Sequence, residues 1–183
     1  TRGAAPVLSF ADAVLAGLAT DGGLYLPQQW PSAPETLTTD YASLAASVMS
    51  PFIGDEIDAK TLQKLCSTAY STFRDPRVTP LVPLEANHWM LELFHGPTLA
   101  FKDVALQFLG QLFDFLLDER DEHITIVGAT SGDTGSAAID GVGLAGWDDH
   151  TDKETANLGM LAPLTKRAAV LLYRLQVGDR PKM

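Results

Sequence analysis

The most informative stretch of this sequence is HGPTLAFKD, which occupies residues 95–103. Its glycine and proline predict a turn after a short strand at residues 89–94. The apolar spacing that follows predicts an amphipathic helix at residues 103–117. Lys102 is therefore expected at the start of a helix, where a strand and a turn have just ended.

The same order of elements is predicted again further along the chain. The apolar run at residues 124–127 predicts a buried strand, and GATSGDTG at residues 128–135 predicts a glycine-rich turn. Another helix is expected over residues 134–139. A strand, a helix and a second strand in this span predict a right-handed βαβ unit with parallel strands, so the predicted fold class is α/β.

The residues before this unit predict a small, mostly helical region. Ser9, three residues before Asp12, is typical of a helix start. A short strand is expected at residues 24–26, and further helices at residues 41–49 and 59–73.

Three regions follow from these elements. Residues 1–80 are predicted as the mostly helical unit, residues 81–142 as the βαβ region, and residues 143–183 as a tail of different composition. A connector with several prolines, residues 74–83, contains the predicted boundary. The tail lacks the strands that a doubly wound sheet requires, so the α/β domain is expected to be truncated.

Composition excludes several classes of protein. The chain has 183 residues, 46% of them hydrophobic and 20% charged, which argues against disorder. Its net charge of -10 argues against nucleic acid or an anionic membrane as partner. A single cysteine, Cys66, favours a reducing compartment, and we expect a cytoplasmic protein. The histidines show no metal-ligand spacing, so no metal site is predicted.

The two turns favour a particular chemistry. Ligands of open parallel sheets bind beyond the carboxyl ends of the strands, where both turns are expected. A lysine must be neutral to form an imine with an aldehyde, and burial at a helix N-terminus favours the neutral amine. The glycines and hydroxyls of residues 131–135 suit an anion. An amine for an imine beside an anion-binding loop is what a pyridoxal phosphate enzyme needs.

Simpler interpretations of the same residues stay open. Lys102 is also compatible with a solvated lysine beside a turn, and the loop with a plain connection in which Ser131 or Asp133 caps the next helix. His95 either contacts a ligand or bonds to the backbone of its turn.

In these motifs the sequence resembles threonine synthase of the bacterial and fungal type, a family of fold-type II pyridoxal phosphate enzymes. The resemblance covers residues 1 to about 142 and is carried by segments 1–3, 21–27, 73–84, 91–103 and 128–135. It implies conversion of O-phospho-L-homoserine and water to L-threonine and phosphate, with pyridoxal phosphate as cofactor.

The resemblance also implies roles for individual residues. Lys102 matches the lysine that carries the cofactor as an imine and then moves protons as general base and acid. Asp133 matches a residue near the cofactor, and Ser131, Gly132, Asp133 and Thr134 match the loop that faces the substrate.

Two other functions remain as alternatives. One is another fold-type II lyase, of the threonine dehydratase or cysteine synthase type; the helical N-terminal unit and Asp133 argue against it. The other is a non-catalytic remnant or interaction protein with an exposed strand edge, because unpaired edges invite association.

Overall fold

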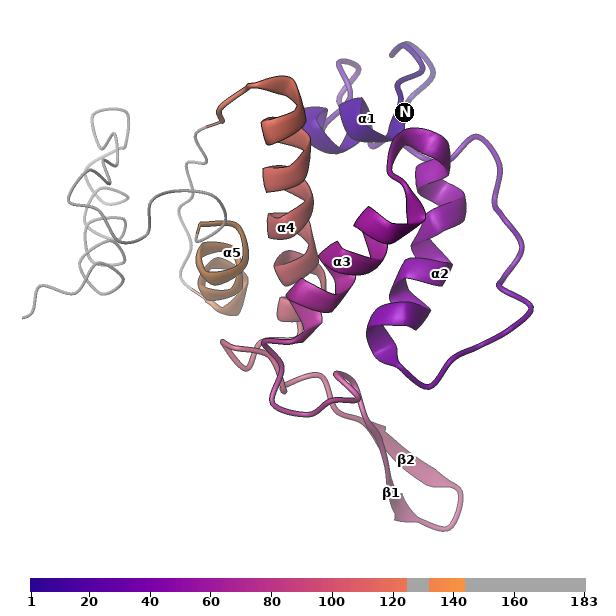
Figure 1. Cartoon of the computed structure of the whole chain (residues 1–183), viewed down its shortest axis with the longest axis vertical. Helices are drawn as coiled ribbons and strands as arrows, with labels where there is room; N and C mark the ends of the chain where they lie inside the picture. Colours follow the sequence, from indigo (N-terminus) through magenta and orange to yellow (C-terminus); the bar gives the residue numbers. More distant parts are fainter. Residues whose placement is uncertain (125–131, 144–183) are drawn as a thin grey trace, which may run out of the picture.

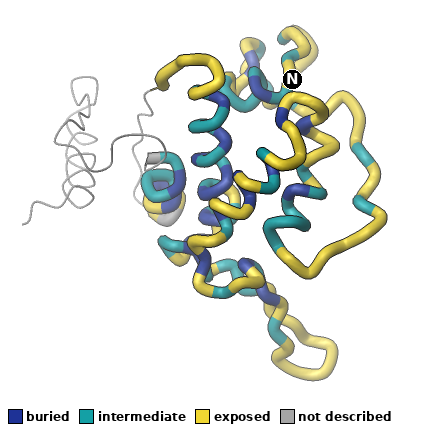
Figure 2. Tube along the Cα trace, in the orientation of Figure 1, coloured by how far each residue is buried: buried dark blue, intermediate teal, exposed yellow. Residues whose placement is uncertain are grey.

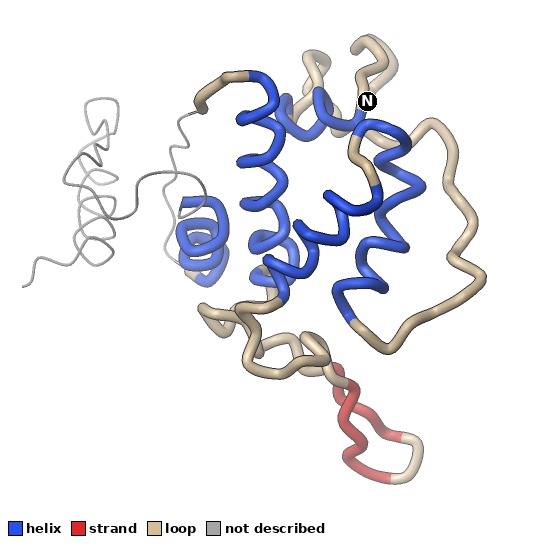
Figure 3. The backbone as a smooth tube through the Cα atoms, viewed as in Figure 1, coloured by secondary structure: helices blue, strands red, loops and turns tan. Residues whose placement is uncertain are grey.

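A computed structural model of the chain describes residues 1–124 and 132–143, and helices predominate among them (Figures 1 and 3). The described elements are α1 (Phe10–Ala16), α2 (Tyr41–Ile53), the 3-10 helix η1 (Gly54–Glu56), α3 (Ala59–Tyr70), β1 (Leu81–Glu85), β2 (His88–Leu91), α4 (Asp103–Arg120) and α5 (Asp133–Gly143). None of the helices in these described ranges is long and apolar enough to cross a membrane.

The first three α-helices begin at side chains that accept hydrogen bonds from first-turn N–H groups. Ser9 accepts from Asp12 at 3.1 Å, which confirms the predicted helix start. Asp40 and Asp58 do the same for α2 and α3, at 2.8 Å and at 2.9–3.0 Å respectively. These caps satisfy backbone donors that a helix leaves without partners, so the chain's own polar side chains set these helix starts.

One core joins α4 to the N-terminal helices. Figure 1 shows α2, α3 and α4 side by side with α1 across one end, and Figure 2 shows buried positions along these helices. The buried cluster contains Ala11, Ala46, Ile53, Ile57, Leu62, Leu65, Cys66, Ala69, Phe108, Leu112 and Leu116. The domain boundary near residue 80 stays a prediction, although apolar contacts continue across it.

The strand predicted at residues 89–94 is found in part, as β2, while most of its predicted parallel partner at residues 124–127 lies outside the described residues. β2 pairs antiparallel with β1, with Leu91 opposite Leu81, and the two form a hairpin. Asn87 supplies the left-handed conformation of the turn with φ 66°, which asparagine tolerates better than most residues. Closing this short loop costs less entropy than closing a long crossover. The predicted connector in fact contains the start of β1.

Other predicted boundaries also shift. The helices expected at residues 41–49 and 103–117 extend to Ile53 and Arg120, whereas the helix expected at residues 59–73 ends at Tyr70. The strand expected at residues 24–26 is reduced to a single bridge between Leu24 and Leu18. Most of the strand expected at residues 124–127 lies outside the described residues.

Helices α4 and α5 cross at a pair of glycines. A Cβ added at Gly110 would collide with the backbone of Gly141, and one added at Gly141 would collide with the backbone of Leu106. Beside this crossing, Gln107 donates a hydrogen bond of 2.7 Å from Nε2 to Asp140 Oδ2. The two helix backbones are therefore in direct contact, which only glycine at both positions permits.

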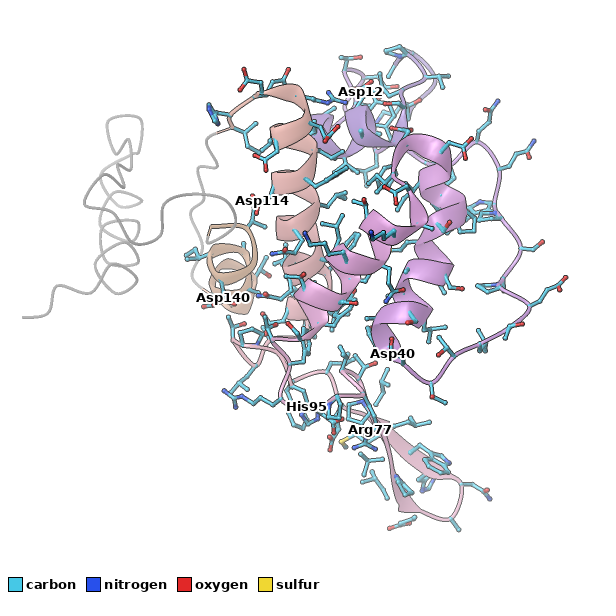
Figure 4. All side chains as sticks on the ribbon, in the orientation of Figure 1. Asp12, Asp40, Arg77, His95, Asp114 and Asp140 are labelled. Atoms are coloured by element: carbon cyan, nitrogen blue, oxygen red, sulfur yellow. The ribbon has the colours of Figure 1, made fainter. Side chains whose placement is uncertain are left out.

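The carboxyl of Asp114 provides a pH-dependent test of α4. Burial raises its pKa from 3.8 to about 6, and repulsion from Asp118 adds to the increase. Figure 4 shows Asp114 on the same side of α4 as α5. A carboxyl with a raised pKa in the folded state stabilises the fold below its ordinary pKa, and this contribution is lost as the pH rises through about 6.

We therefore expect Asp114→Asn to stabilise the protein at alkaline but not at acid pH. A fully buried group with this pKa change would yield roughly 3 kcal/mol, and partial solvation of the side chain reduces the expected gain to about 1 kcal/mol. Urea unfolding at pH 8 and pH 3 measures the difference between the variant and the parent chain. Asp118→Asn, at an exposed position, should give a smaller gain of the same sign; an equal effect at both pH values would contradict the assignment.

Candidate functional site

The segment before α4 is a tight turn with one strained residue. The N–H of Leu99 donates to the carbonyl of Gly96 at 3.2 Å, and Leu99 has a φ of 65°. A side chain in this left-handed region costs about 1–2 kcal/mol, because Cβ approaches the following carbonyl oxygen. Strain of this kind persists only where surrounding contacts hold it, and it is common at functional sites.

The buried carboxylate of Asp103 lies at the centre of this turn. Its Oδ2 accepts the backbone N–H of Thr98 at 2.9 Å, and its Oδ1 accepts the Thr98 hydroxyl at 2.7 Å. The side chain is completely buried. A Cβ added at Gly96 would collide with it, so the carboxylate packs directly against that glycine. Asp103 therefore ties the first turn of α4 to the turn that precedes it.

The first N–H groups of α4 are already used by this local structure. Asp103 donates to the carbonyl of Ala100 at 3.1 Å, and Ala105 and Leu106 donate to the carbonyl of Lys102 at 3.1 and 2.9 Å. Tight turns of this type commonly begin an α-helix. The helix start at Lys102 is as the sequence predicted, but these backbone donors serve the turn and are not available for an anion.

Lys102 is partly buried at this helix start, with its amine 4.8 Å from the ring centroid of Phe101. Its side chain makes no cap hydrogen bond to α4. Among the described residues its amine has no carboxylate partner within ion-pair distance. An amine that is not held in an ion pair is available to react with an aldehyde, which is the chemistry predicted for Lys102 from the sequence.

A charged cluster supports the turn from the base of the hairpin. His95 Nε2 lies 2.7 Å from Glu92 Oε2, and the carbonyl of His95 accepts the N–H of Arg74 at 2.9 Å. The guanidinium of Arg77 binds Asp75 at 2.7 Å and lowers the pKa of that carboxyl to about 2. His95 and Arg77 lie close together in Figure 4. The His95 ring thus binds a carboxylate, which neither sequence interpretation of this residue included.

The second predicted turn leads into α5. Asp133 is the first residue of α5 and Thr134 follows it, and the carbonyl of Gly132 accepts the N–H of Gly135 at 3.0 Å. Ser131 lies outside the described residues. Lys102 and Asp133 therefore begin the two helices that cross at the glycine pair, each about 12 Å along its helix from the crossing. That the amine and the loop share one pocket stays a prediction.

The contact between Thr98 and Asp103 was missed in the sequence. Thr98 and Asp103 are five residues apart, and an acid in the first turn of a helix is most simply explained by the helix dipole. The signal available was that the acid follows Lys102 directly within a segment of apolar and small residues.

Among residues 1–124 and 132–143, no three histidine, cysteine or acidic side chains lie together in a way that could hold a metal ion.

Comparison with known proteins gives consistent matches. Residues 1–70 match the family described as threonine synthase N terminus. The chain is 51% identical over 146 residues to a threonine synthase from Pseudomonas aeruginosa, covering 77% of this chain and 31% of that protein. It is 52% identical over 157 residues to a threonine synthase from Schizosaccharomyces pombe, covering 78% of this chain and 30% of that protein.

A solved structure agrees with these relatives. A threonine synthase from Brucella melitensis with bound pyridoxal phosphate is 53% identical and superimposes with a TM-score of 0.75. The match covers 79% of this chain and 32% of that one. The chain thus spans about a third of the length of the relatives that it matches, and the similarity concerns the N-terminal part of those proteins.

Proposed function

We propose that this chain, which belongs to the threonine synthase family over its N-terminal part, uses Lys102 to hold pyridoxal phosphate and acts on O-phospho-L-homoserine. The proposed reaction converts this substrate and water into L-threonine and phosphate. The predicted cytoplasmic location belongs to the same proposal.

The observation that carries the proposal is the environment of Lys102. Lys102 is a partly buried residue whose amine lacks a carboxylate partner among the described residues, and it follows a turn that Asp103 holds and that contains the strained Leu99. A lysine that served only as a surface charge would not require such a support. The bound cofactor in the Brucella melitensis relative makes pyridoxal phosphate the natural candidate.

The protein's own groups then have defined tasks. Bound pyridoxal phosphate supplies an electron sink for negative charge that develops on substrate carbons. The free amine of Lys102 would take and return protons at those carbons, which is general acid–base catalysis. Ser131, Gly132, Asp133 and Thr134 are proposed to face the substrate, with Asp133 also near the cofactor.

Reductive trapping tests this proposal on the full chain. We expect pyridoxal phosphate followed by borohydride to leave a pyridoxyl group on Lys102, identified by peptide mass spectrometry. Exposed Lys60 and Lys64 on α3 serve as internal controls for nonspecific reaction. Labelling spread evenly over the three lysines would refute the assignment, and release of phosphate from O-phospho-L-homoserine then tests the reaction itself.

Two other functions remain distinguishable. Another fold-type II lyase would trap the cofactor but would not release phosphate from O-phospho-L-homoserine; the relatives described above argue against it. An interaction protein is favoured by the hairpin, where Leu81, Trp89 and Leu91 are each more than half exposed (Figure 2). In that case we expect association with a partner and no trapping at Lys102.

A further inference from the structure

We propose that Asp103 is a positioning residue for Lys102, because its buried carboxylate holds the turn from which the amine is presented. The inference rests on the proposed function of Lys102. It gives a role to Asp103, an acidic side chain that is completely buried. Asp103 is not expected to touch cofactor or substrate, since its side chain is completely buried and both of its oxygens bind Thr98.

The contacts of Asp103 hold together the residues that precede α4. The carboxylate binds both the N–H and the hydroxyl of Thr98, and it packs against Gly96 on another side. Two hydrogen bonds to one residue restrain its orientation as well as its distance, and bonds to a carboxylate are stronger than neutral ones. The backbone between Thr98 and Asp103, which includes Lys102, is therefore held at both ends.

The position of Lys102 depends on these contacts of Asp103. Lys102 is partly buried, and its amine lies over the ring of Phe101, which is itself 57% exposed. No hydrogen bond from the Lys102 side chain caps α4, and no carboxylate of the described residues pairs with its amine. The backbone that carries the side chain therefore contributes to the position of the amine, and Asp103 is the next residue along that backbone. A displacement of about 1 Å at a reacting group can cost about a hundredfold in rate.

Substitutions can separate position from charge. In Asp103→Asn the amide oxygen can accept the Thr98 N–H, and the amide nitrogen can donate to the Thr98 hydroxyl, because a hydroxyl also accepts. This variant keeps both hydrogen bonds and removes the charge. Asp103→Ala removes both bonds and the contact of the carboxylate with Gly96, while it keeps Cβ. Thr98→Val removes only the hydroxyl bond.

Two measurements on the full chain test the proposal. Trace acetylation with acetic anhydride, analysed by mass spectrometry, reports the reactivity of Lys102 relative to Lys60 and Lys64 without any cofactor. The rate of borohydride trapping of pyridoxal phosphate at Lys102 is the second measurement. In Asp103→Ala we expect the Lys102 acetylation ratio to approach that of the exposed lysines, and trapping to slow by about 10–100-fold.

The conservative variants decide between position and charge. Asp103→Asn is expected to restore most of the trapping and the acetylation ratio lost in Asp103→Ala, and Thr98→Val should fall between the two. Asp118→Asn, an exposed carboxylate on the same helix, is the control. If Asp103→Asn is as impaired as Asp103→Ala, charge rather than position is responsible and the proposal is wrong.

The remaining outcomes are also informative. Folding of each variant is checked by circular dichroism. If Asp103→Ala does not fold, Thr98→Val takes its place, and an unchanged acetylation ratio in folded Thr98→Val would overturn the proposal. If the parent chain traps no cofactor, the proposed function fails, but the acetylation ratios still test whether Asp103 positions the amine.

Discussion

Lys102→Ala is expected to eliminate the borohydride-stable pyridoxal phosphate adduct at this position and all turnover of O-phospho-L-homoserine by the chain. A methyl group cannot form an imine or transfer protons, so no residual reaction is expected at residue 102. The loss should not come from unfolding. The side chain makes no cap hydrogen bond, and its contact with the half-exposed Phe101 is worth about 0.5–1 kcal/mol.

Lys102→Arg is the matched control for charge. Arginine keeps a positive group that can stack on Phe101, but it does not lose its proton and cannot form the imine. Both variants should therefore lose trapping, whereas Lys60→Ala and Lys64→Ala should retain it. The absorbance of the bound cofactor and peptide mapping give the readout. Undiminished trapping in Lys102→Ala, with the label on another lysine, would contradict the assignment.

Gly110→Ala is expected to destabilise the protein by about 1–3 kcal/mol, although helix propensity alone predicts a gain of about 1 kcal/mol. The added Cβ would collide with the backbone of Gly141, and a backbone cannot move aside as a flexible side chain can. Helices α4 and α5 must then separate, which also weakens the bond between Gln107 and Asp140. The sign of the effect therefore distinguishes a tight crossing from an ordinary helix position.

Urea unfolding followed by circular dichroism measures the change in Gly110→Ala. Ala105→Gly, at an exposed position of the same helix, calibrates the propensity difference and should cost about 1 kcal/mol. Gly141→Ala should behave like Gly110→Ala, because its Cβ meets the backbone of Leu106. Hydrogen exchange should be accelerated in α5 before the other helices. A stabilised Gly110→Ala variant would rule out the close contact.

Local signals predicted the helical part of the fold well. Ser9, Asp40 and Asp58 cap their helices through bonds to residues two or three positions away, and interactions of that range are visible in a sequence. The apolar stripe of residues 103–117 similarly predicted α4, whose buried Phe108, Leu112 and Leu116 follow the helical period.

The strand expected at residues 89–94 is found in part as β2, but its antiparallel neighbour β1 was not predicted. In this hairpin Trp89 and Leu91 are more than half exposed. Alternation and composition report how a strand is buried, and they do not identify its neighbour. The left-handed Asn87 was the available signal for the hairpin turn, because a short turn between two extended segments favours local pairing.

The residue types and their order in the chain determined where helices begin, that Lys102 lies at the start of α4, and that the chain resembles the N-terminal part of threonine synthases. These properties depend on neighbouring residues or on motifs. The three-dimensional packing decided that Asp103 is buried beneath Gly96 and that Gly110 meets Gly141. These contacts join positions whose approach depends on how the turn folds and how two helices cross. Excluded volume and the need to satisfy a buried carboxylate select that geometry, and they act only once the chain is folded.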